Sequence, residues 1–91
     1  MTNTKQLHEL ITERMRARNL TDIALRDLLL EYGVPVSRQS VREYRVGSRL
    51  PSIQQGQGLS RALGIPAARL LEAAALQARM RQQDGQQDEA A

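Results

Sequence analysis

The chain has 91 residues and a formal net charge of +3, and it contains no cysteine, phenylalanine or tryptophan. The absence of cysteine excludes a disulfide framework and a thiolate zinc site, and a chain of this length holds only one small core. Leucine, isoleucine, valine, alanine and methionine have to build that core, which suits helices better than sheets. We therefore expect a single all-α domain.

Several other classes of protein are disfavoured. No apolar run approaches the roughly 20 residues of a membrane span, and the first residues lack the apolar stretch of a secretory signal. We expect a cytoplasmic protein without membrane contacts. One histidine and no paired carboxylates leave nothing for acid–base chemistry, so we expect neither an enzyme nor a metal or cofactor site.

The charge is unevenly placed along the chain. Residues 82–91 carry Asp84, Asp88 and Glu89 and no base, which leaves +6 on residues 1–81. Between Ser37 and Arg61 the single acid is Glu43. The arginines of this stretch are Arg38, Arg42, Arg45, Arg49 and Arg61. A compact basic zone of this kind predicts a polyanionic partner, most often nucleic acid.

Two helices are expected before this basic zone. The first is capped by Asn3 or Thr4 and extends to about Arg18. Its apolar stripe consists of Leu7, Leu10, Ile11 and Met15. His8 has no histidine or cysteine partner, so we interpret it as a surface residue rather than a metal ligand. The second helix is capped by Thr21 and ends at Gly33, and it is apolar nearly all round, as expected of a helix packed between others.

The third expected helix, Arg38–Val46, carries the residues of most interest. Ser37 is its cap and Gly47 its stop. Val41 and Tyr44 fall on one side and predict a packed face. The opposite side carries Arg38, Gln39, Arg42 and Glu43. Arginine and glutamine are the types that read guanine and adenine edges in the major groove; a solvated surface helix is the plainer alternative.

The fourth expected helix begins with a capping box, Ser52 to Gln55, and ends at Gly64. Its expected buried side consists of Ile53, Leu59 and Leu63. Gly56 and Gly58 cost about 1 kcal/mol each relative to alanine in a helix interior. They indicate either a closely approaching neighbour or a distorted helix, and the sequence leaves both open.

The fifth expected helix begins near Pro66 and extends to about Gln82. We assign its core face to Leu70, Leu71, Ala74 and Ala78. A second apolar stripe, Ala73, Leu76 and Met80, is a candidate dimer interface; scattered exposed apolar residues are the alternative. Residues 83–91 are rich in glutamine and acids and are expected to be disordered, which leaves residues 1–82 as the domain.

Taken together, these features resemble the Cro/C1-type (XRE-like) helix-turn-helix family. The matching residues, spaced without a gap, are Ser37-Arg38-Gln39-Ser40-Val41, Tyr44, Gly47, Pro51-Ser52, Ala62-Leu63-Gly64-Ile65 and Leu70-Leu71. The resemblance covers about residues 5–75. Two departures stand out: the segment between Leu20 and Ser37 is longer than usual in the family, and Asp22, which phosphate would repel, stands where glutamine is common.

The resemblance implies a compact five-helix domain of the lambda-repressor-like type, with the third helix in the major groove of DNA. It implies base reading by Arg38, Gln39, Arg42 and Glu43. It implies backbone contacts by Ser37, Ser40, Arg45, Ser48 and Arg49. The chemistry of these residue types agrees with reading of base edges but does not predict the order of the bases.

The sequence therefore predicts a double-stranded DNA-binding transcriptional regulator, most simply a repressor. We expect a homodimer on a near-palindromic operator, located in the cytoplasm and associated with the nucleoid when bound. The first alternative is an antitoxin-like or accessory DNA-binding protein whose main role is to bind a partner protein. The second is a helical protein–protein adaptor that never contacts DNA.

Overall fold

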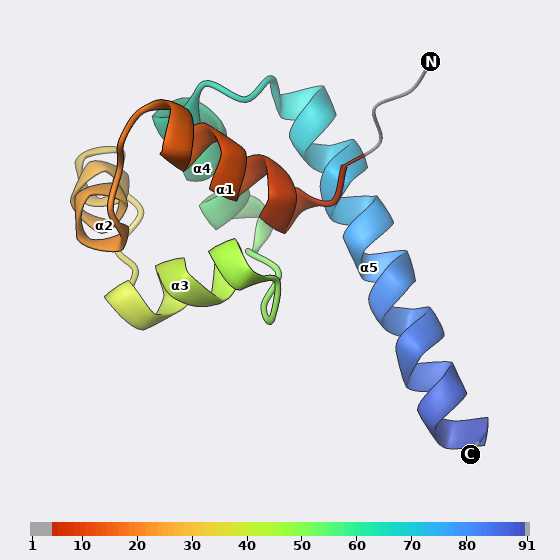
Figure 1. Ribbon diagram of the computed structural model, residues 1–91. Helices are drawn as coiled ribbons and strands as arrows, with labels where there is room; N and C mark the ends of the chain where they lie inside the picture. Colours follow the sequence, from red (N-terminus) through yellow and green to blue (C-terminus); the bar gives the residue numbers. More distant parts are fainter. Residues whose placement is uncertain (1–4, 91) are drawn as a thin grey trace.

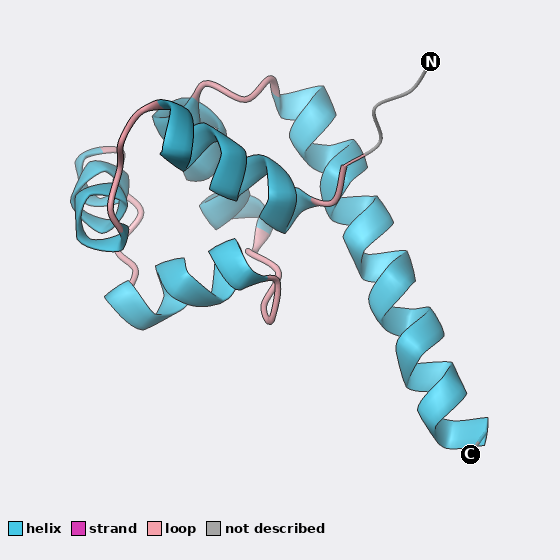
Figure 2. Ribbon diagram, viewed as in Figure 1, coloured by secondary structure: helices cyan, strands magenta, loops and turns pink. Residues whose placement is uncertain are grey.

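Five helices form the part of the chain that the structure describes. A computed structural model describes the backbone of residues 5–90 and the side chains of residues 5–82. The helices are α1 (Leu7–Ala17), α2 (Asp22–Glu31), α3 (Arg38–Val46), α4 (Ile53–Leu63) and α5 (Ala67–Ala90). Residues 5–90 contain no strand (Figure 2), which confirms the expected all-α class.

Helix α1 is the centre of the arrangement, because it packs against α3, α4 and α5 (Figure 1). Helix α2 packs against α3 and α4, and α4 packs in turn against α5. The second half of α5 extends away from the other helices (Figure 1). None of the helices in the described part of the chain combines the length and the apolar character needed to cross a membrane.

The predicted helix ends are confirmed at most positions. The side chains of Thr21, Ser37 and Ser52 each accept a hydrogen bond from a backbone N–H in the first turn of α2, α3 and α4. The capping box of α4 is complete. Gly47 and Gly64 end α3 and α4 in the left-handed conformation, which glycine adopts without the steric cost of a Cβ atom.

Two helix ends differ from the prediction. Helix α1 begins at Leu7 with Gln6 as its cap, and the predicted caps Asn3 and Thr4 lie outside the described residues. Helix α5 continues to Ala90 instead of ending near Gln82. Residues 83–90 contain no proline, so nothing in the covalent chain forces a stop there. The predicted disorder of residues 83–91 is not confirmed.

One hydrophobic core lies between the helices. It consists of Leu7, Leu10, Ile11, Met15, Leu25, Leu29, Val34, Val41, Tyr44, Leu59, Ala62, Leu63, Ile65, Leu70 and Ala73. Helix α2, expected to pack between other helices, does pack against α3 and α4, but not all of its apolar residues are covered: Leu25 and Leu29 are buried, whereas Ile23 and Leu30 are exposed. Helix α2 packs mainly against α3 and α4, and the side that carries Ile23 and Leu30 faces solvent.

The buried face of α5 is rotated from the predicted one. Ala73, assigned to a free dimer stripe, is only 3% exposed and belongs to the core, whereas Leu71, assigned to the core, is exposed. The buried face also includes a polar residue: Gln77 accepts a hydrogen bond through Oε1 from the backbone N–H of His8 at 2.8 Å. Ala73 and Gln77 are one turn apart and so lie on the same face of α5.

Close approach of a neighbour explains Gly58 but not Gly56, and helix α4 is continuous through both positions. A Cβ atom at Gly58 would lie 2.6 Å from Cγ2 of Val34. A Cβ atom at Gly56 would meet only Cδ2 of Leu70, at an ordinary 3.4 Å. Ile53, which we expected on the buried side of α4, is exposed at its first turn.

The glycine pair yields a matched prediction. Gly58→Ala should lower the free energy of unfolding by about 1–3 kcal/mol, because the added methyl group overpacks the contact with Val34. Gly56→Ala should raise it by up to about 1 kcal/mol, because alanine is the better helix former and its methyl group fits. Urea denaturation of both variants checks this, and equal shifts in the same direction would contradict it.

Candidate nucleic-acid interface

Helix α3 is held against α1 along its inner face. Val41 and Tyr44 are fully buried, and the hydroxyl of Thr12 on α1 donates to the backbone carbonyl of Arg45 at 3.0 Å. Where α3 ends, the ring of the half-buried His8 lies so close to Gly47 that a Cβ there would approach it to 2.9 Å. His8, which we expected at the surface, is half-buried and packs against the end of α3.

Tyr44 also joins α3 to α4. Its hydroxyl donates to Oε1 of Gln55 at 2.7 Å, and the same oxygen accepts the backbone N–H of Ser52 in the capping box of α4. Burial raises the pKa of the Tyr44 phenol above its usual value, and nearby Glu43 acts in the same direction while Arg49 opposes both. The neutral phenol is thus part of the joint between α3 and α4.

A bidentate ion pair joins α3 to α2. Arg45 donates through Nε to Oδ1 of Asp22 at 2.9 Å and through Nη2 to Oδ2 at 3.0 Å. Its hydrogen bond with Asp22 raises the pKa of Arg45, so the guanidinium stays charged. Asp22 opens α2, where a negative charge is favourable next to the helix dipole. Arg45 is therefore committed to an internal partner.

The opposite flank of α3 carries a second polar group of side chains. The Ser37 hydroxyl caps Ser40 N and donates to Ser40 Oγ at 3.1 Å. Arg49, in the loop after α3, donates to Ser40 Oγ at 3.1 Å and lies 3.6 Å from a carboxylate oxygen of Glu43. These contacts hold Arg49 beside the helix, where its charge remains accessible because the side chain is exposed.

The outer face of α3 is free. Within residues 5–82, no hydrogen bond or ion pair engages the side chains of Arg38, Gln39 or Arg42, and all three are exposed. Together with Asp22 they line a shallow depression at the start of the helix. Val46 is 50% exposed on the same face and adds an apolar contact surface.

The predicted site residues thus separate into two groups. The free group is Arg38, Gln39 and Arg42, and the internally paired group is Ser37, Ser40, Glu43, Arg45 and Arg49. Ser48 is exposed, and its backbone N–H donates to the carbonyl of Glu43 at 3.0 Å. Sequence reasoning missed the partner of Arg45, because pairing across 23 residues leaves no periodic signal.

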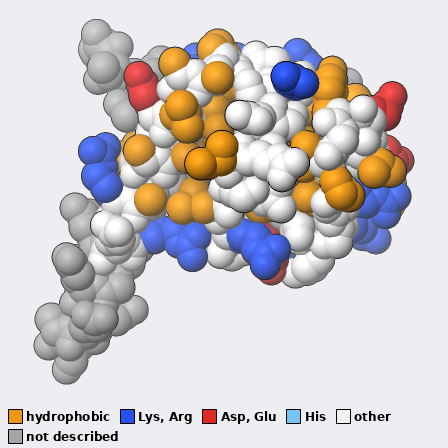
Figure 3. All heavy atoms as spheres, turned by 180° about the vertical axis from the view of Figure 1, so that it is seen from behind, with side chains coloured by type: hydrophobic (Ala, Val, Ile, Leu, Met, Phe, Trp, Pro, Cys, Tyr) orange, Lys and Arg blue, Asp and Glu red, His pale blue; other side chains and the backbone are white. Residues whose placement is uncertain are grey.

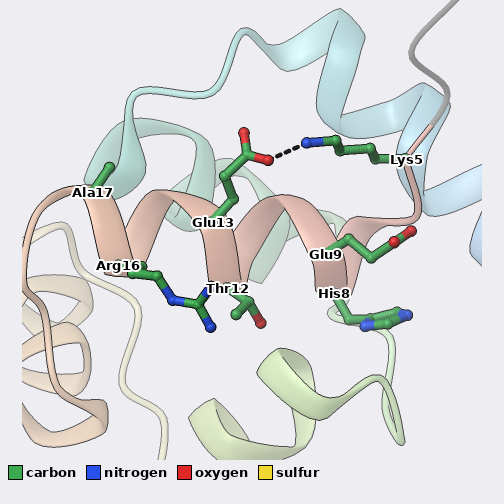
Figure 4. Close-up of a pocket in the computed structure, with 7 residues that line it drawn as sticks. All are labelled: Lys5, His8, Glu9, Thr12, Glu13, Arg16 and Ala17. Atoms are coloured by element: carbon green, nitrogen blue, oxygen red, sulfur yellow. Dashed lines mark hydrogen bonds and ion pairs between the residues drawn. The ribbon is translucent and has the colours of Figure 1, made fainter.

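The outer side of α1 also carries a hollow, shown in Figure 4 with the seven residues that line it. It contains both signs of charge, and Lys5 forms an ion pair with Glu13 (Figure 4). The hydrogen bond from Lys5 is the main cause that lowers the pKa of Glu13. Because its charges compensate each other, this hollow does not extend the basic surface of α3.

The comparisons with known proteins add no constraint on this site. A scan against protein-family models, a search of curated proteins and a search of solved structures each find no match. The contacts, exposure and charge of α3 therefore carry the functional argument.

The joint at Tyr44 predicts a pH dependence. Burial raises the pKa of Tyr44 in the folded protein above about 10, the usual value for tyrosine. The contribution of the neutral phenol to stability is therefore fully present below about pH 10. It is lost as the pH rises through the raised pKa of the folded protein. Tyr44→Phe should lose about 1 kcal/mol at neutral pH, since the bond to Gln55 is gone. Its stability should also fall less steeply above pH 10. Denaturation of both proteins from pH 7 to 11 tests this, and parallel curves would contradict it.

Proposed function

We propose that the chain is a sequence-specific double-stranded DNA-binding transcriptional regulator, most simply a repressor, of the lambda-repressor-like helix-turn-helix type. In this proposal α2 and α3 are the two helices of the motif, and α3 enters the major groove. The protein acts as a homodimer on a near-palindromic operator, in the cytoplasm and on the nucleoid. Its work is binding rather than catalysis.

The observation that carries the proposal is the free row of Arg38, Gln39 and Arg42 on a helix held by α1, α2 and α4. A reading helix needs a fixed position, because base edges are distinguished by the geometry of hydrogen bonds. It also needs donors and acceptors that no internal partner uses. Helix α3 meets both requirements, and its N-terminal residues are the ones that contact bases in helix-turn-helix proteins.

The neighbouring polar side chains suit contacts with the DNA backbone. Ser37, Ser40 and Arg49 form one hydrogen-bonded group beside the start of α3, and Ser48 is exposed in the loop that follows the helix. Hydroxyls and arginines of this kind fix the register of a protein on phosphates. Glu43 remains a candidate for the cytosine amine. Arg45 is the weakest candidate, because Asp22 already neutralises it.

An antitoxin-like or accessory role is the second candidate. It keeps the DNA contact and adds a partner protein. Exposed apolar residues on α2 and at its C-cap favour this role: Ile23, Leu30 and Tyr32 are all solvent-accessible. Contiguous apolar patches on a protein surface mark interaction sites. Ile23→Ser combined with Leu30→Ser distinguishes the roles. Loss of regulation in cells with DNA binding intact in vitro would favour the partner protein.

The first experiment compares a reading residue with a backbone residue. Gln39→Ala should cost about 1–3 kcal/mol on the preferred site and relax the choice at one base pair, with nonspecific binding unchanged. Arg49→Ala should weaken binding to all sequences alike and reduce the salt slope by about one ion per lost phosphate contact. Fluorescence anisotropy titrations with the selected site and with scrambled DNA, at several salt concentrations, measure both effects.

The alternative to a reading helix is a merely solvated one, and the same titrations decide between them. The side chains of Arg38, Gln39 and Arg49 are exposed, so each variant should unfold at the same temperature as the wild type. Thermal unfolding is therefore the control for folding. Equal discrimination by the wild type, Gln39→Ala and Arg38→Ala would rule out a reading role for α3. A flat plot of log affinity against log salt would rule out nucleic acid as the partner.

The ion pair of Asp22 with Arg45 predicts a gain of affinity. Asp22→Asn releases a guanidinium beside the reading face and removes a charge that repels phosphate. Affinity for operator and for unrelated DNA should rise together, with a salt slope steeper by about 0.9 for each new phosphate contact. Asp27→Asn is the matched control, because it removes the same charge from an exposed position on α2. If Asp22→Asn and Asp27→Asn raised the affinity for DNA equally, the gain would come from net charge and not from the release of Arg45.

A further inference from the structure

The last turn of α3 carries an apolar side chain, Val46, on a face that is otherwise polar. Val46 is 50% exposed, whereas the other apolar residues of α3, Val41 and Tyr44, are fully buried. Single exposed apolar residues are common on protein surfaces and need no functional explanation. The place of Val46 on the helix is what distinguishes it from them.

Val46 lies in line with the free side chains of α3. It follows Arg42 by four residues and Gln39 by seven, so at 100° per residue it lies between the two around the helix axis. Residues spaced by i, i+3 and i+7 form one stripe along a helix. The base-reading residues of a homeodomain helix have the same spacing, so Val46 occupies the third turn of a reading stripe.

The polar side chains on either side of Val46 have internal partners. Arg45 is paired with Asp22, and a carboxylate oxygen of Glu43 lies 3.6 Å from Nη1 of Arg49. Val46 is therefore the side chain that the last turn of α3 presents between them. Because valine has no hydrogen-bonding group, a ligand group that meets it favourably has to be apolar.

The backbone of this last turn is held in place. Thr12 on α1 donates to the carbonyl of Arg45 at 3.0 Å, and the ring of His8 packs against Gly47. The side chain of Val46 adds little freedom of its own, because a β-branched residue in a helix has one strongly preferred χ1 rotamer. Its two methyl groups therefore have a defined position on the outer face of α3.

The larger apolar surface of the molecule does not include Val46. Figure 3 shows apolar side chains gathered on the face opposite to the view of Figure 1, with basic side chains along its lower edge, where α3 lies. An apolar hollow between α4 and α5 is lined by Ile53, Leu70 and Leu71, and Val46 is not among its lining residues. Val46 is thus a separate apolar group among the basic side chains of α3.

We propose that Val46 contacts the C5-methyl group of a pyrimidine in the major groove and so determines sequence choice at one position of the operator. The inference rests on the proposed function, because it requires α3 to lie in that groove. The C5-methyl group is the apolar group that base pairs present there, and thymine carries it whereas cytosine does not. Cytosine methylated at C5 presents the same group, so thymine and 5-methylcytosine are two sources of one ligand chemistry.

The length of α3 fixes where this methyl group should lie. At about 1.5 Å per residue, Val46 is about 10 Å along the helix from Gln39. Base pairs are about 3.4 Å apart, so a helix lying along the groove places the methyl group about 2–3 base pairs from the pair that Gln39 contacts. Since glutamine suits adenine, the pyrimidine should follow an adenine at this distance.

The experiment removes the methyl group from the DNA and the valine from the protein. In a site selected from random duplex DNA, each thymine of one half-site is replaced in turn by deoxyuridine, which lacks only the C5-methyl group. Fluorescence anisotropy should show binding of the wild type weakened about 3- to 5-fold at one position, the effect of about one methyl group left in water. Val46→Ala should bind the thymine and deoxyuridine duplexes equally well.

Two further measurements complete the design. Leu71→Ala is the matched control, because it shortens an apolar side chain that is exposed on α5, and it should keep the difference between thymine and deoxyuridine. At the responsive position, a C·G pair is also compared with its C5-methylated form. A gain of about 3- to 5-fold on methylation, absent in Val46→Ala, assigns both sources to the site. A response to thymine alone assigns the contact to thymine.

The outcomes separate this inference from the proposed function. Val46→Ala should fold, because the residue is half exposed and alanine is the better helix former, and thermal unfolding checks this. Equal binding of thymine and deoxyuridine by the wild type at every position overturns the inference, and so does a Val46→Ala variant that keeps the difference. In both cases the selected site is still bound, so the proposed function stands. If no sequence is enriched from the random pool, both fall.

Discussion

The side chain of Tyr44 holds helix α3 in place from two directions. The ring of Tyr44 is buried in the core, and its hydroxyl donates to Gln55, which in turn completes the capping box of α4. A single residue thus fixes the inner face of α3 and joins it to the next helix. These contacts hold α3 through its inner face alone. The side chains on the outer face, Arg38, Gln39 and Arg42, are therefore not needed to hold the helix and remain available for a ligand.

The ion pair between Asp22 and Arg45 is a second constraint on helix α3. A bidentate contact holds the start of α2 against the end of α3 and also removes one positive charge from the flank of the proposed reading face. Phosphate contacts supply most nonspecific binding to DNA, so in the proposed complex this pairing would shift the balance from general affinity toward discrimination between sequences. The basic zone is therefore less basic in the folded protein than its composition indicates.

Local signals in the sequence predicted much of this fold. The caps Thr21, Ser37 and Ser52 and the stops Gly47 and Gly64 act through neighbouring backbone groups, so their positions follow from the chain itself. Long-range contacts were not predictable in this way. The bond from His8 to Gln77 spans 69 residues and belongs to the buried face of α5 that also holds Ala73. An apolar pattern does not reveal a face that contains a buried glutamine, so Ala73 was misassigned. Reading roles for Arg38, Gln39 and Arg42 stay predictions.

Selection of bound sequences from a pool of random duplex DNA tests the central claim most directly, because it presupposes neither an operator nor a variant. The account predicts enrichment of one motif made of two related half-sites in inverted orientation, with centres about 10 base pairs apart. Each half-site should contain guanine or adenine where arginine and glutamine of α3 reach. A pool that remains random after repeated rounds, although the protein is folded, would contradict the account.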